Sequence, residues 1–362
     1  MNGPHPPGTA VELPRSVLSG KRVRYRMPQR RVSDRAFDSA LERGRAGDVD
    51  LASALSLFHG ADREDRRRQL FEAAARVRDE HLGRRLTLTA HLHMVTRCEL
   101  SASCKYCSLS STIPSVSDER SPLTLRETLK GVRFALDRKV DSIVLVGGTD
   151  LDGSDARVRT LVSRIREVTD VPLGLDVGPS LSAATLRWLV RRGVDPIYCS
   201  METIDPEVFA DAKPGDNLEA RLRFMDRVER SGGHLGNIAM NGLGGPESLL
   251  KTVLASRRFP HTSHLHISTF HPVAGTPWAR RRAASAQSSL KALAIARLAF
   301  PALQLGLAEV GVENPRDLAS VPSQLLAGGG NTIAAVLVYK YLRIDHGDRI
   351  RAQAASAGFE TS

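Results

Sequence analysis

Residues 124–149 read TLRETLKGVRFALDRKVDSIVLVGGT and contain the pattern on which the fold prediction depends. Thr124–Arg138 has the apolar spacing of an amphipathic helix, and Ser142–Val146 is a short apolar run of strand length. The pair Gly147-Gly148 follows this run and ends it. The stretch therefore predicts a helix, a buried strand and a turn, in that order.

The same alternation of strand and helix continues along the chain beyond Arg84. The predicted strands are Leu86–Met94, Ser142–Val146, Leu173–Val177, Ile197–Met201, His234–Met240, His264–Phe270, Leu303–Ala308 and Asn331–Val336. The predicted helices among them are Thr124–Arg138, Ala156–Val168, Ala183–Arg192, Asn217–Ser231, Ser248–Arg258 and Ser288–Ala299. About eight such units predict an α/β fold with a parallel sheet, a (β/α)8 barrel of the TIM type. A doubly wound open sheet is not favoured, because no G-x-G-x-x-G turn follows the first strand.

Residues before the barrel have a different pattern. Ser33–Arg45, Asp50–Phe58 and Asp62–His81 read as helices that extend the barrel at its N-terminal side. The predicted organisation is a flexible basic arm over residues 1–32, N-terminal helices over 33–84, the barrel over 85–345, and a C-terminal helix or tail over 346–362.

The composition limits the possible classes of function. Hydrophobic residues make up 41% of the 362 residues and charged residues 25%, which excludes a chain disordered throughout. The net charge is +11, but the basic arm contributes +6 of it, and aromatic residues for base stacking are not interleaved with the basic ones. Nucleic-acid binding is therefore not favoured. Without an apolar run near 18 residues or an N-terminal segment of signal-peptide type, we expect a cytoplasmic protein that does not enter a membrane.

Three of the four cysteines stand together after the first predicted strand, in Cys98-Glu-Leu-Ser-Ala-Ser-Cys104-Lys-Tyr-Cys107. Three thiolates in one loop can converge on a metal centre, and three leave one coordination position open where four would close it. The alternative is a zinc site completed by His91 or His93, which lie on the preceding strand. The spacing therefore predicts a metal centre formed by the three cysteines.

These cysteines and a series of later motifs resemble the radical S-adenosylmethionine (SAM) superfamily, in its branch of biotin synthase, methylornithine synthase and hydrogenase-cofactor maturases. The motifs, in order, are Cys104-Lys-Tyr-Cys107 with Cys98, Val146-Gly-Gly-Thr149, Cys199-Ser-Met-Glu202-Thr-Ile-Asp-Pro-Glu, Leu218-Glu-Ala-Arg221-Leu, Asn241-Gly-Leu-Gly244, Gly275-Thr-Pro277, Ala294-Ile-Ala-Arg297 and Leu326-Ala-Gly-Gly-Gly-Asn331. The C-x5-C-x2-C spacing departs from the usual C-x3-C-x2-C of the superfamily. It resembles the maturase of the iron–guanylylpyridinol hydrogenase cofactor.

The resemblance implies a reaction and its cofactors. Cys98, Cys104 and Cys107 would ligate a [4Fe–4S] cluster whose fourth iron binds SAM. An electron, delivered by a donor such as flavodoxin or ferredoxin, would cleave SAM to a 5′-deoxyadenosyl radical that abstracts hydrogen from a small polar metabolite. We expect such an enzyme in cofactor or specialised-metabolite biosynthesis.

The resemblance also assigns the contacts of SAM. Tyr106 would lie beside the adenine. Gly147, Gly148 and Thr149 would let the backbone approach the methionyl amine. Glu202 would accept hydrogen bonds from the ribose or the ammonium group, with Ser200 on the same face, and Arg221 would pair with the methionyl carboxylate.

Substrate residues are predicted from strand alternation. Leu265 and Ile267 should face the helices, which turns His264, His266 and Ser268 into the barrel interior. Asp176 stands in a similar position between two apolar residues, and Asn237 and Asn241 lie near the end of the fifth strand. The candidate catalytic residues are therefore Asp176, His266 and Ser268; a structural polar layer is the alternative.

Cys199 is the one cysteine outside the loop, so a second cluster ligated by thiolates cannot be formed. Its side chain should face the helical layer as a small buried apolar group. Sulfur insertion from an auxiliary cluster is therefore not expected, although biotin synthase is similar. A methyltransferase or a carbon-skeleton rearrangement is the alternative reaction, and a zinc- or nucleic-acid-binding protein is the alternative of another class.

Overall fold

The helix and strand within residues 124–149 form as predicted. In the computed structural model, α5 (Leu125–Leu136) begins at a capping box in which Thr124 and Glu127 each accept a hydrogen bond from the other's backbone N–H. The three central residues of β2 (Ser142–Val146) are buried. The structure describes residues 32–107, 121–149, 154–308, 325 and 327–361, which lie in one unit, Val32–Ser362.

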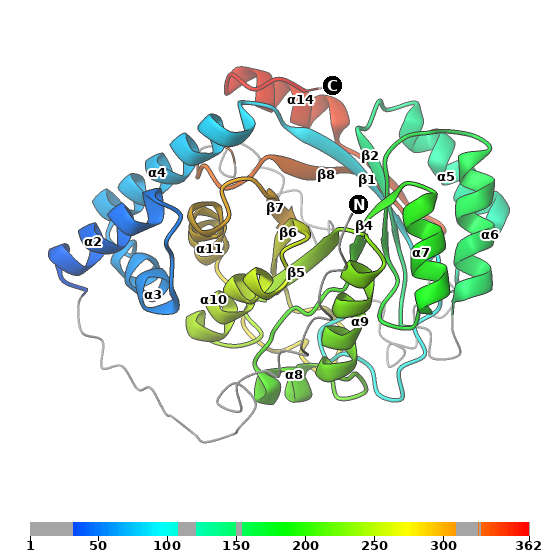
Figure 1. The fold of residues 1–362 in the computed structure, drawn as a ribbon, viewed down its shortest axis with the longest axis horizontal. Helices are drawn as coiled ribbons and strands as arrows, with labels where there is room; N and C mark the ends of the chain where they lie inside the picture. The colour runs from blue at the N-terminus through cyan, green and yellow to red at the C-terminus, as the bar shows by residue number, and fades with distance from the viewer. Residues whose placement is uncertain (1–31, 108–120, 150–153, 309–324, 326, 362) are drawn as a thin grey trace, which may run out of the picture. The chain divides into compact units, whose positions relative to one another are not determined.

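Eight parallel strands form the predicted barrel sheet, and a ninth strand adds to its edge (Figure 1). The strand order is β7-β6-β5-β4-β3-β2-β1-β8-β9, and β9 runs antiparallel to β8. The strands are β1 Thr87–His93, β2 Ser142–Val146, β3 Leu173–Asp176, β4 Val194–Tyr198, β5 Leu235–Asn241, β6 Thr262–Thr269, β7 Gln304–Ala308, β8 Thr332–Val338 and β9 Arg343–Asp345. The predicted TIM-type fold is confirmed.

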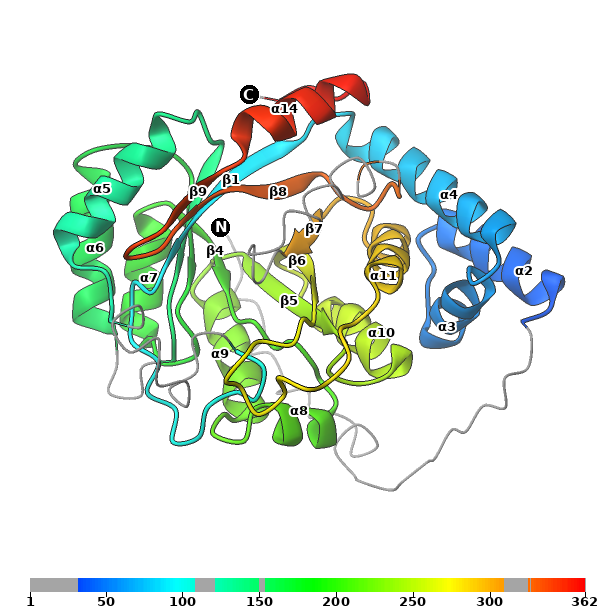
Figure 2. The same cartoon turned by 180° about the vertical axis from the view of Figure 1, so that it is seen from behind.

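The barrel closes between β7 and β8 through Asn331, which precedes β8. Its backbone N–H donates to the Leu305 carbonyl (2.8 Å), and its Oδ1 accepts from the Leu305 N–H (2.9 Å). The buried Arg297 donates to the same Oδ1 and to the backbone carbonyls of Leu303 and Gly329. Figure 2 shows β7 and β8 side by side at this closure. Arg297 and Asn331 are therefore structural residues at the N-terminal end of the barrel.

Helices cover the outside of the sheet. They are α5 Leu125–Leu136, α6 Asp155–Arg166, α7 Ala183–Arg191, α8 Pro206–Ala212, α9 Leu218–Arg230, α10 Pro246–Leu254 with η2 Ala255–Arg258, α11 Ala286–Ala299 and α14 Gly347–Ser356. Before the barrel come α2 Asp34–Arg45, α3 Leu51–Gly60 and α4 Glu64–Leu82, which pack on α10 and α11 (Figure 1). The predicted N-terminal helices are confirmed. The basic arm lies outside the described residues apart from Val32, and the domain boundaries stay a prediction.

The fourth strand lies three residues earlier than predicted. The sequence pattern places it over Ile197–Met201, whereas β4 spans Val194–Tyr198. Its N-terminal half includes Pro196, which has no backbone N–H for a ladder, and the register against β3 is irregular there. Residues 199–201 consequently follow the strand and belong to a loop at its C-terminal end.

Strand alternation separates the side chains of the helical layer from those of the barrel interior. Leu265 and Ile267 belong to the core shared with α10 and α11, so His264, His266 and Ser268 face inward, as predicted. Paired residues of adjacent strands point to the same face. The pairs Asp176–Tyr198 and Tyr198–Gly236 therefore add Asp176 and Tyr198 to the interior.

Candidate active site

The cysteine loop begins where β1 ends, at the C-terminal end of the barrel where TIM-type enzymes place their active sites. Cys98, Cys104 and Cys107 are each partly exposed in it. Cys104 and Cys107 pack against an apolar cluster that includes Tyr106 and Trp278. Burial raises the pKa of the Cys104 thiol to about 11. A metal that binds Cys104 therefore has to displace a proton from it.

The glycine pair after β2 makes room for the cysteine loop. A Cβ on Gly148 would lie 2.3 Å from the Cβ of Cys98, and one on Gly147 would lie 2.0 Å from Oγ1 of Thr96. The Gly148 carbonyl accepts from Thr96 Oγ1 (3.0 Å), and the Thr149 carbonyl accepts from the Glu99 N–H (2.8 Å). No side chain fits at either glycine, which is a physical reason for the pair beside its predicted approach to SAM.

Tyr106 and Glu202, both predicted SAM contacts, meet at one oxygen atom. The Tyr106 hydroxyl donates to Oε2 of Glu202, and the Nζ of Lys213 lies 2.7 Å from the same oxygen. Glu202 has a backbone φ of +64°, which turns its side chain inward beyond the end of β4. Burial, followed by the Glu202 charge, raises the pKa of Tyr106 well above its ordinary value, so the phenol keeps its proton.

Arg221 lies in α9 and is buried rather than exposed at the helix surface. Its Nη2 lies 2.6 Å from Oδ2 of Asp216, and its Nη1 donates to the Ser200 carbonyl (2.9 Å). Another N–H reaches Oγ1 of Thr149 at 3.4 Å. Burial opposes ionisation of Asp216, but Arg221 and Lys213 outweigh it and lower the pKa of Asp216 to about 2. The structure thus brings Thr149, Ser200 and Arg221 together.

Lys213 and Asp216 complete this network, and the motif analysis did not single them out. Lys213 Nζ lies 3.3 Å from Oδ2 of Asp216 as well as near Glu202. Burial and the Arg221 charge lower the pKa of Lys213, whereas Glu202, Cys104 and Asp216 raise it; the net direction is upward. The turn Lys213-Pro-Gly-Asp216, which directly precedes the Arg221 motif, was the available sequence signal.

Asp176 and Ser200 form the inner edge of the site. Ser200 Oγ donates to Oδ2 of Asp176 at 2.7 Å, while no hydrogen bond joins Oδ1 to another described residue. Burial raises the pKa of Asp176, and the Ser200 hydrogen bond opposes that shift. Asp176 therefore presents one carboxylate oxygen to the barrel interior.

Below Asp176 the interior is aromatic and uncharged at neutral pH. Tyr198 Oη lies 3.3 Å from Nε2 of His266, and the rings of His264 and His266 stack at 6.5 Å. Burial lowers the pKa of His264 to about 4 and that of His266 to about 3. Ser268 Oγ is buried and has no hydrogen-bond partner among the described residues. His266 and Ser268 are thus in the interior, as predicted, with a polar atom of Ser268 left for a ligand.

Asn237 and Asn241 do not belong to this interior, contrary to the sequence-based prediction. Asn237 pairs with the outward-facing Leu265, and its Oδ1 accepts from the Met201 N–H. Asn241 Nδ2 donates to Oγ of Ser289 in α11. The prediction was wrong because both asparagines alternate with the inward positions of β5.

Cys199 lies on the helical side of the sheet, as predicted. It is fully buried, and its Sγ donates to the carbonyl of Arg221 in α9 at 3.6 Å. Burial raises its pKa to about 11. This cysteine is therefore separate from the cysteine loop.

The zinc alternative required His91 or His93 to share one ion with the cysteines. His93 stacks on Tyr339 with 4.5 Å between ring centroids, and His91 Nε2 lies 3.3 Å from Oγ1 of Thr89. Within the described ranges, no three His, Cys, Asp or Glu side chains converge on a site for a single metal ion. Ligands of a four-iron cluster bind separate iron atoms and surround a larger volume. Neither histidine therefore forms a three-residue site with the cysteines among the described residues.

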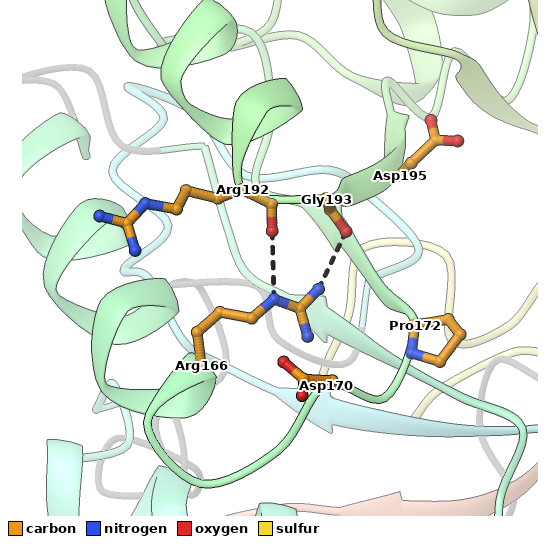
Figure 3. Close-up of a pocket in the computed structure, with 6 residues that line it drawn as sticks. All are labelled: Arg166, Asp170, Pro172, Arg192, Gly193 and Asp195. Atoms are coloured by element: carbon orange, nitrogen blue, oxygen red, sulfur yellow. Dashed lines mark hydrogen bonds between the residues drawn. The ribbon is translucent and has the colours of Figure 1, made fainter.

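A cavity of about 480 Å³ opens at the other end of the barrel (Figure 3). It is lined by Arg166, Asp170, Pro172, Arg192, Gly193 and Asp195, which lie around the N-terminal ends of β3 and β4. Arg166 donates to the carbonyls of Arg192 (3.1 Å) and Gly193 (2.9 Å), as the dashed lines show. The cavity is thus at the opposite end from the cysteine loop and is not part of the candidate site.

In the part of the chain that the structure describes, no helix is both long and apolar enough to cross a membrane. The predicted cytoplasmic location stays a prediction.

Comparisons with known proteins match this architecture. The chain is 26% identical to the 3-methylornithine synthase of Methanosarcina barkeri over 278 residues, which is 74% of each protein. It is also 26% identical to the biotin synthase of Desulforudis audaxviator over 249 residues, covering 68% of this chain and 73% of that protein. An uncharacterized protein of Methanocaldococcus jannaschii is 26% identical over 293 residues, or 80% of this chain and 76% of that one.

Solved structures share the fold. A methylornithine synthase superposes with a TM-score of 0.76 at 19% identity, over 89% of this chain and 97% of that one. The [FeFe]-hydrogenase maturase HydG of Carboxydothermus hydrogenoformans superposes with a TM-score of 0.76 at 20% identity, over 91% and 79%. Residues 92–256, from β1 to η2, match the Radical SAM superfamily. These residues therefore form a radical SAM domain, and this domain supports an enzyme whose reaction is left open.

Proposed function

We propose that Cys98, Cys104 and Cys107 hold a [4Fe–4S] cluster and that the barrel interior binds a small polar metabolite from which hydrogen is abstracted. Enzymes of this superfamily use such a cluster together with SAM. The donor set supports this assignment, because three cysteines share the loop at the C-terminal end of the barrel. The fourth cysteine contacts α9 on the other face of the sheet.

When bound, the cluster supplies the electron that cleaves SAM to a 5′-deoxyadenosyl radical. The protein contributes position and charge around it. The glycines at 147 and 148 keep the β2 end narrow enough for the cysteine loop to approach. Three thiolates would hold the cluster and leave a position for SAM, and Tyr106, Phe270 and Trp278 form an apolar cluster against Cys104 and Cys107.

The charges of the half-buried Glu202 and the buried Arg221 are suited to the polar groups of SAM. Glu202 is proposed to accept hydrogen bonds from its ribose or ammonium group. Arg221 is fixed by Asp216 and Ser200 and is proposed to pair with its carboxylate, with Thr149 beside it. The Tyr106 ring is proposed to lie beside the adenine.

The substrate is proposed to occupy the interior below these groups. Asp176 has a carboxylate oxygen without a hydrogen-bond partner among the described residues, and Ser268 has a buried hydroxyl in the same condition. His266 is neutral and can accept or donate one hydrogen bond. These groups fit a substrate with hydroxyl or amine donors. The proposed reaction is hydrogen abstraction without sulfur insertion, and an electron donor such as flavodoxin or ferredoxin stays a prediction.

The observation that carries the proposal is the cysteine loop at the end of β1 beside the half-buried Glu202 and the buried Arg221. Anaerobically reconstituted protein, reduced with dithionite and given SAM, is expected to release 5′-deoxyadenosine. Cys104→Ala should lower both the iron content and the release. Cys199→Ala is the matched control, because it removes a buried thiol on the helical side and should keep both. Equal release from wild type and Cys104→Ala would overturn the proposal.

A further inference from the structure

We infer that Lys213 is a positioning residue for SAM, which holds Glu202 so that one of its two carboxylate oxygens is presented to the ligand. The inference rests on the proposed function, since it concerns the same SAM site. It adds a residue that neither the motifs nor the comparisons assign to that site.

Two donors converge on the same oxygen of Glu202. The hydroxyl of Tyr106 and the Nζ of Lys213 both contact Oε2, the latter at 2.7 Å. No hydrogen bond joins Oε1 of Glu202 to any described residue. The carboxylate is therefore held at one oxygen, and the other can accept a hydrogen bond from a ligand.

Lys213 is itself held in place from several sides. Its side chain is 3% exposed, and its Nζ lies 3.3 Å from Asp216 and 3.5 Å from the Ser200 carbonyl. The ammonium group also lies 5.2 Å from the ring centroid of Phe209. A buried lysine with this many partners cannot follow a moving carboxylate, so it fixes the orientation of Glu202.

The position of Lys213 also couples two loops of the site. The turn after α8 packs on the cysteine loop, because the Lys105 N–H donates to the Ala212 carbonyl (2.9 Å) and a Cβ on Gly215 would collide with Ala102. Lys213 stands in this turn, and Tyr106 stands between two cysteines. Their shared contact on Glu202 thus joins the cysteine loop to the segment that leads to Arg221.

A double-mutant cycle on SAM binding tests the inference without an activity assay. The dissociation constant is measured by equilibrium dialysis with radiolabelled SAM on anaerobically reconstituted proteins of equal iron and sulfide content. Lys213→Met should weaken binding by about tenfold or more in the otherwise wild-type protein, since a buried charged hydrogen bond is lost. In a Glu202→Gln background the same change should cost less than about twofold, because the partner charge is already absent.

Lys291→Met is the matched control. Lys291 is equally buried and binds a carboxylate, a carbonyl and an aromatic ring, but its partners are Phe58 in α3 and Asp62 in the turn before α4. This variant should leave the dissociation constant unchanged, which separates the role at Glu202 from the general cost of replacing a buried lysine.

Unchanged binding by Lys213→Met, or an equal loss in both backgrounds, would overturn the inference. If Lys213→Met fails to take up iron, Lys213→Gln, which keeps an N–H donor without the charge, enters the same cycle with the same expectation. A wild-type protein that carries the cluster but does not bind SAM would overturn the proposed function itself, and this inference with it.

Discussion

Arginines at the two ends of the barrel are buried against different partners. At the C-terminal end, Arg221 pairs with the carboxylate of Asp216, in a network that also contains Lys213 and Glu202. At the N-terminal end, the acceptors that Arg297 finds among the described residues are all neutral: the carbonyls of residues 300, 301, 303 and 329 and the amide oxygen of Asn331. Burial without a counter-charge lowers the pKa of Arg297 to about 9, whereas that of Arg221 is raised despite burial.

The difference separates the proposed SAM site from a structural closure. Arg297 in α11 binds acceptors that directly precede β7 and β8. Its hydrogen bonds therefore connect these elements to one another. At the other end, Glu202 and Asp176 each have one carboxylate oxygen with a partner and one that accepts no hydrogen bond from a described residue. Both residues are partly exposed, so these oxygens are open to a ligand or to water. This contrast predicts which changes affect stability and which affect binding.

The largest effect is expected for Arg297→Met. Removing the guanidinium takes a donor from buried carbonyls, although the Asn331 amide oxygen keeps the Leu305 N–H, so the free energy of unfolding should fall by about 3–5 kcal/mol. Urea denaturation of the metal-free protein measures this. The folded fraction should bind SAM normally once reconstituted; a selective loss of SAM affinity with unchanged stability would contradict the assignment of this end as structural.

Arg221→Met should lower the affinity for SAM more than it lowers stability. Loss of the charge-assisted hydrogen bond that we propose to the SAM carboxylate is expected to weaken binding by about 10- to 100-fold, or roughly 1.5–3 kcal/mol. The loss of stability should be smaller than for Arg297→Met, because Asp216 keeps Lys213 and the Asn217 N–H as partners. Equilibrium dialysis gives the affinity, and wild-type affinity in this variant would remove Arg221 from the proposed SAM site.

The neutral histidines of the interior predict a dependence of stability on acid. In the unfolded chain a histidine takes up a proton near pH 6.5, whereas His266 in the folded protein does so only near pH 3. The unfolded state therefore binds more protons as the pH falls through this window, and stability declines by up to about 1.4 kcal/mol per pH unit for this residue. His266→Gln should flatten the decline between pH 6.5 and pH 4, as measured by urea denaturation. An identical slope in both proteins would show that His266 is not held neutral.

The smallest effect is expected in the cavity at the N-terminal end of the strands. Arg192→Ala removes an exposed guanidinium. The contact with Arg166 is made by the backbone carbonyl of Arg192 and is kept in this variant. We expect a change in stability within about 0.5 kcal/mol and unchanged SAM affinity. A large loss of SAM affinity would mean that this cavity communicates with the site.

Much of the fold was predictable from local patterns. Apolar runs such as Ser142–Val146, each followed by a turn and an amphipathic helix, predict eight parallel strands, and eight form. The short α8 and β9 were not predicted, since neither is long enough to show a periodicity. The boundary of β4 was displaced because the run Ile197–Met201 is apolar in sequence, although the chain leaves the sheet after Tyr198.

The site was predictable in its residues more than in its contacts. The motifs identify Tyr106, Glu202 and Arg221. Lys213 and Asp216 belong to none of these motifs, and their role depends on a turn that brings Lys213 back to Glu202. Strand alternation alone identifies His266 and Ser268 as interior residues. The register of β5 against β6 excludes Asn237 and Asn241 from the interior, because their paired residues on β6 face the helices.

The central claim is that the three cysteines of one loop leave a cluster position to which SAM binds. Electron paramagnetic resonance of the reduced, reconstituted enzyme tests it most directly. Addition of saturating SAM should change the signal of the reduced cluster in the wild type and in Cys199→Ala. A spectrum that is the same with and without SAM, in protein shown to contain the cluster, would contradict the account.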